Sequence, residues 1–160
     1  SIVFFPEYYE WLDEISPAHI FSRSIHGEGF RMRKSFENGI LNYRKYDSCL
    51  ENALTVESPE SLCKIALNRL RWPSRLEGIF REKYENVIKK YMGTAFTLAV
   101  KDQDFPMLQF ICEHFSPDAS ALASAIDQCI EKEWGEGNAF LIEAKHKSFS
   151  KKTFDFDLDF

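Results

Sequence analysis

The sequence predicts an all-α protein made of stacked helical hairpins, and three observations support this fold class. With 7 glycines and 6 prolines among 160 residues, the chain is poor in the residues that a turn-rich β-sandwich needs. Apolar residues recur every three or four positions, which is the helix period. Short helical segments alternate with breaks, and because one helical hairpin cannot bury its apolar face alone, several hairpins must stack.

Residues 1–57 are expected to form an N-terminal helical cap or irregular repeats. Pro6 and Pro17 suit the first turn of a helix, and apolar residues follow each of them at helical spacing. The expected elements are, in order, a short strand or apolar plug over residues 1–5, a helix over 6–16, a helix from Ser16 to the break at 27–29, and a helix over 30–46.

Residues 58–149 are expected to form helical repeats. After a loop over Thr55–Glu60, Ser58 is a candidate N-cap and Pro59 occupies the first helical position. The helices that follow are expected to be separated by breaks at Trp72-Pro73, Gly93, Asp104–Pro106, Ser116–Asp118 and Gly135–Gly137.

An internal repeat centres on three alanines. Ala66, Ala99 and Ala125 are each flanked by apolar or small residues in a short similar motif, and they lie 33 and 26 residues apart. Two helices that pack at close range need a small side chain where they cross. These alanines are therefore predicted to lie at helix contacts.

The stretch Thr94–Phe115 resembles an ankyrin repeat. Its first six residues, Thr94 to Ala99, stand where that family has T-P-L-H-x-A, and its apolar residues Met107, Leu108, Phe110 and Ile111 stand where the second helix is apolar. The resemblance covers about residues 61–147, with an insertion around Lys132–Gly137. Another α-helical array or bundle would place Ala and Leu at similar spacing, and it stays open as an alternative.

Ankyrin-like arrays bind protein partners through the loop before each first helix and through the exposed face of that helix. The resemblance therefore implies a binding surface with three parts. They are Lys89, Lys90 and Tyr91 before the central unit, Ser116, Pro117 and Asp118 before the next unit, and Lys101, Asp102, Asp127 and Gln128 on helix faces.

A second resemblance covers residues 61–80. Ser61-Leu62-Cys63-Lys64-Ile65-Ala66, followed by Leu70 to Leu76 around Pro73, is similar to a SOCS box. That resemblance implies a helix that binds elongin C and a following segment that meets a cullin. It gives an alternative function, a ubiquitin-ligase substrate adaptor.

Residues 150–160 are expected to form an acidic and aromatic tail. From Phe154 to Phe160, apolar and acidic residues alternate, which in a strand gives one apolar face and one Asp face. Such a strand would pair with another segment, such as Ile2–Phe5. The alternative is a terminal ligand peptide that docks Phe156 and Phe160 on a partner.

Charge and cysteine content narrow the classes of ligand. The net charge of −5 and the pI near 5.4 disfavour nucleic acid and anionic membranes as partners. The basic residues Arg31, Arg33, Lys34, Arg44 and Lys45 are interpreted as a solvated helix face. The four cysteines form no CxxC motif and no His stands at ligand spacing, so no metal or other cofactor is expected. Buried thiols and the lack of an 18-residue apolar window indicate a cytoplasmic protein that is not inserted in a membrane.

No catalytic signature is visible. The His26-Gly27-Glu28 loop could hold a base and an acid, but its residues lack metal-ligand spacing, and a loop with no catalytic role is the favoured interpretation. His114 falls near a predicted helix end, where a cation suits the helix dipole. We therefore expect a protein that is not an enzyme, has no small-molecule substrate, and binds an unidentified protein as an adaptor or scaffold. The alternative of another class is a small acidic inhibitor of the immunity-protein type that masks a basic active site.

Overall fold

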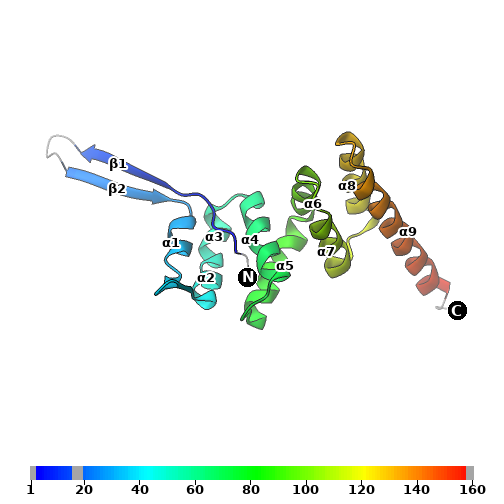
Figure 1. Cartoon of the computed structure of the whole chain (residues 1–160), viewed down its shortest axis with the longest axis horizontal. Helices are drawn as coiled ribbons and strands as arrows, with labels where there is room; N and C mark the ends of the chain where they lie inside the picture. The colour runs from blue at the N-terminus through cyan, green and yellow to red at the C-terminus, as the bar shows by residue number, and fades with distance from the viewer. Residues whose placement is uncertain (1–2, 16–19, 158–160) are drawn as a thin grey trace. The chain divides into compact units, whose positions relative to one another are not determined.

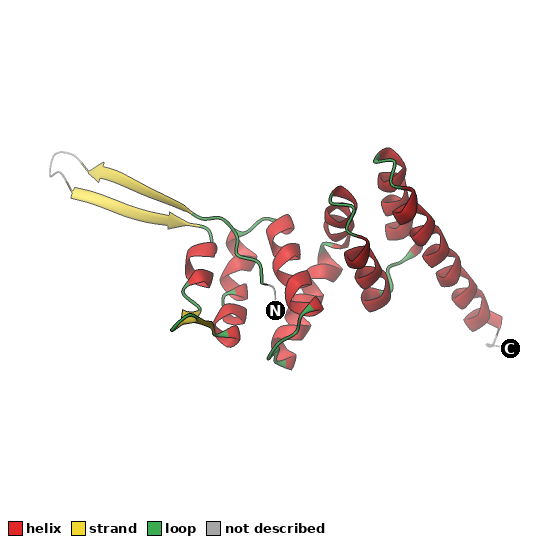
Figure 2. Ribbon diagram, in the orientation of Figure 1, coloured by secondary structure: helices red, strands yellow, loops and turns green. Residues whose placement is uncertain are grey.

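The computed structural model describes residues 3–15 and 20–157, and most of them are helical (Figure 1, Figure 2). The chain forms two compact units, residues 1–87 (unit 1) and 88–160 (unit 2). The helical expectation therefore holds in outline, and two β-hairpins in unit 1 depart from it.

The chain begins with a β-hairpin where two helices were expected. Strands β1 (Tyr9–Ile15) and β2 (Ile20–His26) pair antiparallel, with Tyr9 opposite His26 (Figure 1). The helices predicted over 6–16 and after Ser16 are thus wrong for these residues, and residues 16–19 lie outside the described ranges. Both strands are rich in aromatic and β-branched residues, which favour strands. Of the plug or strand expected over 1–5, the described residues 3–5 form no strand.

The break predicted at Gly27–Gly29 falls between β2 and α1, which begins at Gly29, and close backbone contacts explain its glycines. Gly27 has φ +100°, and a Cβ there would lie 2.8 Å from the Glu7 carbonyl oxygen. A Cβ at Gly29 would lie 1.8 Å from the Pro6 carbonyl oxygen. Only glycine lets residues 6–8 pass this close to the chain.

The helix expected over 30–46 is interrupted by a second hairpin. Helix α1 (Gly29–Arg33) is followed by strands β3 (Phe36–Glu37) and β4 (Ile40–Leu41), and then by α2 (Tyr43–Ser48). Asn38 and Gly39 join the strands with φ of 52° and 77°. Asn-Gly with two positive φ values favours a tight hairpin turn, and here it outweighs the helical spacing of the apolar residues.

Three further helices complete the described part of unit 1. They are α3 (Leu50–Val56), α4 (Pro59–Arg71) and α5 (Gly78–Lys90), the last of which crosses the unit boundary. The predicted cap is confirmed, because the Ser58 side chain accepts a hydrogen bond from the Ser61 amide at 3.2 Å and Pro59 opens α4. The expected loop begins later than predicted, since Thr55 and Val56 belong to α3.

After the last turn of α5, unit 2 consists of two helical hairpins in its described residues. Helices α6 (Met92–Lys101) and α7 (Phe105–Phe115) form the first, and α8 (Ala119–Glu131) and α9 (Gly135–Asp157) form the second (Figure 1). α6 packs on α8, and α7 packs on α9, so that the two hairpins stack. The break predicted at Gly93 lies two residues earlier, because α5 ends at Lys90 and α6 begins at Met92. The break predicted at 135–137 likewise lies just before these residues, which form the first turn of α9.

The same turn closes the first helix of both hairpins. After α6, the Gln103 amide donates to the Val100 carbonyl and the Asp104 amide to the Ala99 carbonyl. After α8, Glu133 and Trp134 repeat this pattern on Ile130 and Cys129. Both are Schellman turns, and Gln103 and Glu133 have positive φ at the position that usually carries glycine. The two turns are 30 residues apart, whereas Ala99 and Ala125 are 26 apart, a difference of about one helical turn.

The three alanines of the internal repeat are fully buried. Ala66 lies in α4, Ala99 in α6 and Ala125 in α8, each the first helix of a sequential pair. Their burial fits close helix packing. Leu108, Ile111 and Leu141 add core from α7 and α9.

The alternating C-terminal residues are helical as far as they are described. Helix α9 continues to Asp157, so the strand predicted from Phe154 is wrong up to that residue, and Phe156 lies in the helix. No Gly or Pro occurs between Asn138 and Asp157 to end it. Phe160 lies outside the described ranges. The division expected after residue 149 falls inside α9, and the one expected after residue 57 falls between α3 and α4.

Candidate partner-binding site

A pocket of about 470 Å³ lies between the end of α7, the start of α8 and the middle of α9. We call it the α9 pocket. Apolar and small side chains make up about half of its wall, and polar and charged groups make up the rest. Its lining residues are Cys112, Glu113, Ser116, Pro117, Leu122, Phe140, Glu143, Ala144, Lys147 and Ser148.

The loop between α7 and α8 forms one wall of the α9 pocket. Ser116 ends α7 in the left-handed conformation (φ 45°), and its amide donates to the Cys112 carbonyl at 3.2 Å. Pro117 is buried, and the Asp118 side chain caps α8 by accepting from the Ala121 amide at 2.8 Å. This turn places the last residues of α7 beside Leu122 of α8.

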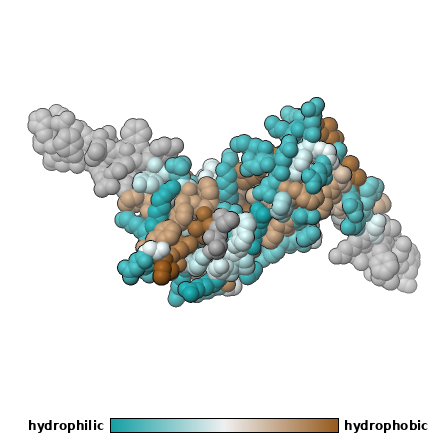
Figure 3. Space-filling view, in the orientation of Figure 1, coloured by the Kyte–Doolittle hydropathy of each residue, from teal (hydrophilic) through white to brown (hydrophobic). Residues whose placement is uncertain are grey.

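Helix α9 forms the opposite wall with a single face. Phe140, Glu143, Ala144, Lys147 and Ser148 follow one another at positions i, i+3, i+4, i+7 and i+8, which is the spacing of residues on one helix side. Ala144 is the smallest of them and leaves room between its larger neighbours. Figure 3 shows apolar and polar surface side by side over unit 2.

The charged groups of the α9 pocket are two carboxylates and one ammonium. Lys147 Nζ lies 3.2 Å from Glu143 Oε1, and both side chains are well exposed. Glu113 is exposed beside Cys112. Burial, with a smaller effect from Glu113, raises the pKa of the Cys112 thiol to about 12, so this thiol stays protonated at neutral pH.

Charge is distributed unevenly between the two units. Residues 88–160 contain 8 Lys, no Arg and 12 Asp or Glu, which gives unit 2 a net charge of −4. Residues 1–87 contain all 8 arginines with 4 Lys and 13 Asp or Glu, a net charge of −1. The acidic character of the chain thus comes mainly from the unit that contains the α9 pocket.

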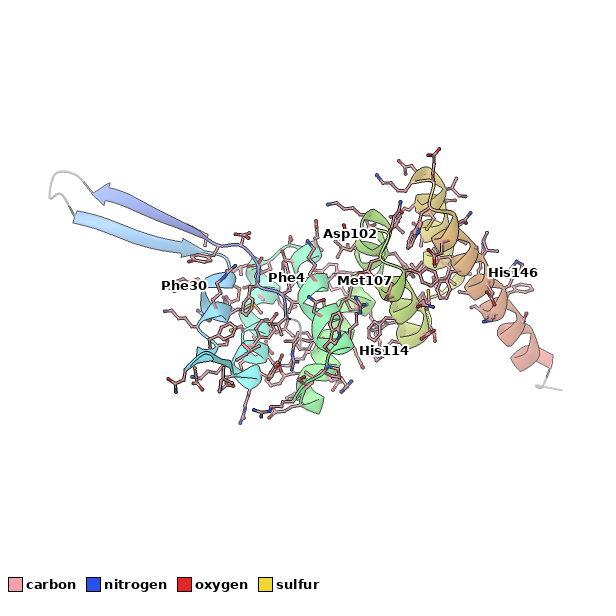
Figure 4. The ribbon with its side chains drawn as sticks, viewed as in Figure 1. Phe4, Phe30, Asp102, Met107, His114 and His146 are labelled. Atoms are coloured by element: carbon pink, nitrogen blue, oxygen red, sulfur yellow. The ribbon has the colours of Figure 1, made fainter. Side chains whose placement is uncertain are left out.

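The structure brings together only part of the predicted binding surface. Ser116 and Pro117 line the α9 pocket, and Asp118 follows them directly. The other predicted residues do not line it. Lys89 and Lys90 are exposed at the end of α5 with Lys90 Nζ 5.2 Å from the Tyr91 ring centre, Lys101 and Asp102 end α6, and Asp127 and Gln128 lie on α8. Figure 4 shows Asp102 and His114 at opposite ends of the α6–α7 hairpin.

Sequence reasoning missed the contribution of α9. The residues of its pocket face recur at helical spacing from Phe140 to Ser148, and this pattern is visible in the sequence. The tail prediction ended the last repeat at residue 149, and binding residues were sought only on first helices and the loops before them. A second helix was therefore not considered as a binding face.

The His26-Gly27-Glu28 loop supports packing inside unit 1. Glu28 is only 2% exposed, its amide donates to Glu57 Oε1 at 2.7 Å, and its side chain accepts from the Asn52 amide group. These contacts tie the start of α1 to the end of α3. His114 is exposed near the end of α7, with its ring stacked 5.0 Å from that of Phe110.

The structure describes all four cysteines and places none of them in a disulfide bond, and Cys63 and Cys129 are fully buried. Across residues 3–15 and 20–157, no three His, Cys, Asp or Glu side chains gather in a way that could hold a metal ion. No helix in the same ranges has the length and apolar composition needed to cross a membrane. No family model, curated protein or solved structure matches the chain.

Proposed function

We propose that this chain is a non-catalytic protein-interaction module, an adaptor or scaffold whose ankyrin-like hairpins bind a segment of a partner protein. The observation that carries the proposal is the α9 pocket, a concave, partly apolar site with carboxylates at its edge. One of its walls is the loop before α8, where the ankyrin resemblance places a binding surface.

Size and charge define the segment that would fit. A volume of about 470 Å³ lies in the range of sites that enclose organic groups, so it can hold a large apolar side chain such as Phe or Leu. Glu113 and Glu143, within a unit of net charge −4, favour Lys or Arg next to that side chain. The proposed ligand is therefore a short peptide segment with an apolar anchor and flanking basic residues.

The test selects peptides from a random library with the full chain and then compares two variants of α9. Ala144→Trp fills the pocket, and Ala139→Trp places the same side chain at an exposed position of the same helix that does not line it. We expect selected peptides to share an apolar residue followed by Lys or Arg, and to lose at least tenfold in affinity only with Ala144→Trp. Equal melting temperatures would show that both variants fold.

Two results would contradict the proposal. One is selection of acidic peptides, or of peptides that bind both variants equally well. The other is a dimer that forms as concentration increases and is lost in Ala144→Trp, because the pocket would then be occupied by a second copy of this chain.

The net charge of −4 on unit 2 also favours the second candidate, an acidic inhibitor that covers a basic active site. Such a protein would inhibit a folded basic enzyme with one-to-one stoichiometry and would lose affinity steeply with salt. Glu143→Gln should then weaken inhibition in low salt more than Ala139→Lys does, although both change the net charge by +1. The SOCS-box alternative requires Leu62 and Cys63 to reach a partner, and both are buried in unit 1, so we do not extend it.

A further inference from the structure

A concave site on unit 1 collects four cationic side chains. Its volume is about 600 Å³, and we call it the basic pocket. Arg31 and Lys34 come from α1 and its C-cap, and Arg44 and Lys45 come from the first turn of α2. Its lining residues are Arg31, Lys34, Ser35, Asn42, Arg44, Lys45, Ser48 and Cys49. No carboxylate is among these described lining residues.

The β3–β4 hairpin creates the basic pocket. A continuous helix over 30–46 would have spread these cations along a solvated surface, as the sequence suggested. The tight turn at Asn38 and Gly39 instead folds α2 back against α1. Two basic groups that are ten or more residues apart in sequence therefore line one cavity.

The present partners of these cations are replaceable. Arg31 Nε lies 3.6 Å from Glu28 Oε1, Arg44 Nε lies 4.0 Å from Glu77 Oε1, and Lys45 contacts Glu37. Lys34 Nζ lies 4.3 Å from the Phe30 ring centre. The Arg44–Glu77 and Lys45–Glu37 pairs are exposed on both sides, and exposed pairs of this kind contribute little to stability. Arg31 is 65% exposed, although its partner Glu28 is buried. A multiply charged anion that contacts several of them at once can compete with these contacts.

We propose that the basic pocket binds a phosphate monoester group. Two guanidinium groups can each donate a pair of hydrogen bonds to phosphate oxygens, and two ammonium groups add charge. Ser35, Ser48 and Asn42 line the same cavity with neutral polar groups. Unit 1 as a whole has a net charge of −1, so a positive potential at this cavity comes from its own four cations and not from the unit as a whole. A compact dianion suits such a site better than a nucleic acid, which needs an extended basic stripe.

The ligand chemistry has two possible sources, a phosphorylated protein or a compact phosphorylated molecule. The full chain is titrated by calorimetry with a phosphoserine peptide, its unphosphorylated form and free O-phosphoserine. In both cases we expect saturable binding of phosphate-bearing probes, at least tenfold tighter than that of the unphosphorylated peptide. A peptide that binds more tightly than free phosphoserine assigns the site to a phosphoprotein, and equal affinities assign it to a compact molecule.

Variants matched in charge locate the binding. Arg31→Gln with Arg44→Gln removes both guanidinium groups, and Arg75→Gln with Arg81→Gln removes the same charge from unit 1 outside the pocket. We expect the first pair to lower affinity at least tenfold and the second pair to change it less than twofold. Replacement of Arg31 and Arg44 by Lys should restore part of the affinity, because Lys keeps the positive charge. The recovery should be incomplete, because Lys cannot donate the paired hydrogen bonds of a guanidinium group.

Three outcomes would overturn the proposal, provided that circular dichroism and melting temperature show folded protein. The first is no saturable binding of any phosphate probe up to millimolar concentration. The second is an equal loss of affinity in both double variants, which would indicate general attraction to positive charge. The third is an oligonucleotide that binds more tightly than the phosphopeptide, with an affinity that increases with its length. This proposal concerns unit 1 alone and stands or falls separately from the α9 pocket.

Discussion

The Asp47 carboxylate accepts a fork of two hydrogen bonds from the Arg69 guanidinium, Nε to Oδ1 at 2.8 Å and Nη2 to Oδ2 at 2.9 Å. Both side chains are buried, and the Tyr84 hydroxyl donates to Asp47 Oδ1 at 2.6 Å. Arg69 Nη2 also donates to the Ser74 carbonyl at 3.0 Å. One ion pair thus connects α2, α4, α5 and the loop after α4. Burial lowers the pKa of Arg69, but Asp47 outweighs it and raises the pKa, so the arginine stays charged.

Asp47→Asn should destabilise unit 1 strongly. The amide keeps the shape of the carboxylate but leaves the Arg69 charge buried without a counter-ion, which costs about 3–5 kcal/mol of unfolding free energy. Glu51→Gln is the control, because it breaks the exposed Lys83–Glu51 pair and should cost less than about 1 kcal/mol. Urea denaturation measures both.

A double variant separates the effect of the two charges from the effect of the volume that their side chains fill. Asp47→Leu with Arg69→Met removes both charges. Its loss of stability should be smaller than the sum of the losses in Asp47→Leu alone and Arg69→Met alone, each of which leaves one buried charge unpaired. If Asp47→Asn loses no more stability than Glu51→Gln, the buried pair does not stabilise the fold.

Stability should fall in alkaline solution because of the buried thiols. The ordinary pKa of 9.0 applies to unfolded Cys63, and burial raises the pKa in the folded protein to about 12. Between these values the unfolded state releases a proton that the folded state keeps. The free energy of unfolding therefore decreases with pH, by about 1.4 kcal/mol per pH unit for each such thiol.

Urea denaturation at pH 8 and pH 10 with a reducing agent tests this effect. Cys63→Ala should be less stable than the parent at pH 8, because the substitution leaves a cavity. Its free energy of unfolding should nevertheless decrease less between pH 8 and pH 10 than that of the parent. Equal losses in the two proteins would show that Cys63 does not contribute.

Two glycine substitutions should act in opposite directions. Gly29→Ala directs a methyl group at the Pro6 carbonyl oxygen and should destabilise by about 1–3 kcal/mol. Gly93→Ala places a methyl group in open space within α6 and should stabilise by up to about 1 kcal/mol, because alanine favours the helix. Thermal unfolding followed by circular dichroism measures both, and a Gly29→Ala protein as stable as the parent would contradict the close approach.

The closing turns of α6 and α8 should become more stable with glycine. Gln103 and Glu133 have φ of 47° and 54°, which costs a non-glycine residue about 1 kcal/mol. Gln103→Gly and Glu133→Gly should each raise the melting temperature. Asp102→Gly, one position earlier with φ −91°, is the control and should lower it.

Local signals in the sequence predicted part of this structure, and contacts between distant residues account for the rest. The Ser58 cap, the break at Ser116–Asp118 and the buried alanines depend on a few neighbouring residues. The Asp47–Arg69 pair joins residues 22 positions apart, and nothing near either residue indicates it. The first hairpin was missed because short apolar segments with aromatic residues fit both strand and helix patterns.

The candidate sites, too, were predicted from local signals only in part. Ser116 and Pro117 were found from the repeat pattern, whereas the face of α9 depends on where that helix ends. The cations of the basic pocket were noticed as a group. Their gathering depends on the turn at Asn38 and Gly39, a two-residue signal that a longer apolar periodicity concealed.

The matching turns after α6 and α8 bound a 30-residue segment of unit 2. A segment that starts at Asp104 and ends at Glu133 begins and ends at the same point of the same turn. Duplication or deletion of these 30 residues would therefore join equivalent positions of the two turns, and we expect the helices that follow to keep their orientation. A 26-residue segment measured between the alanines would instead move the closing turn by about one helical turn along the helix. A change in the length of unit 2 by this 30-residue segment, measured from turn to turn, is therefore the change that we expect to preserve the helix contacts.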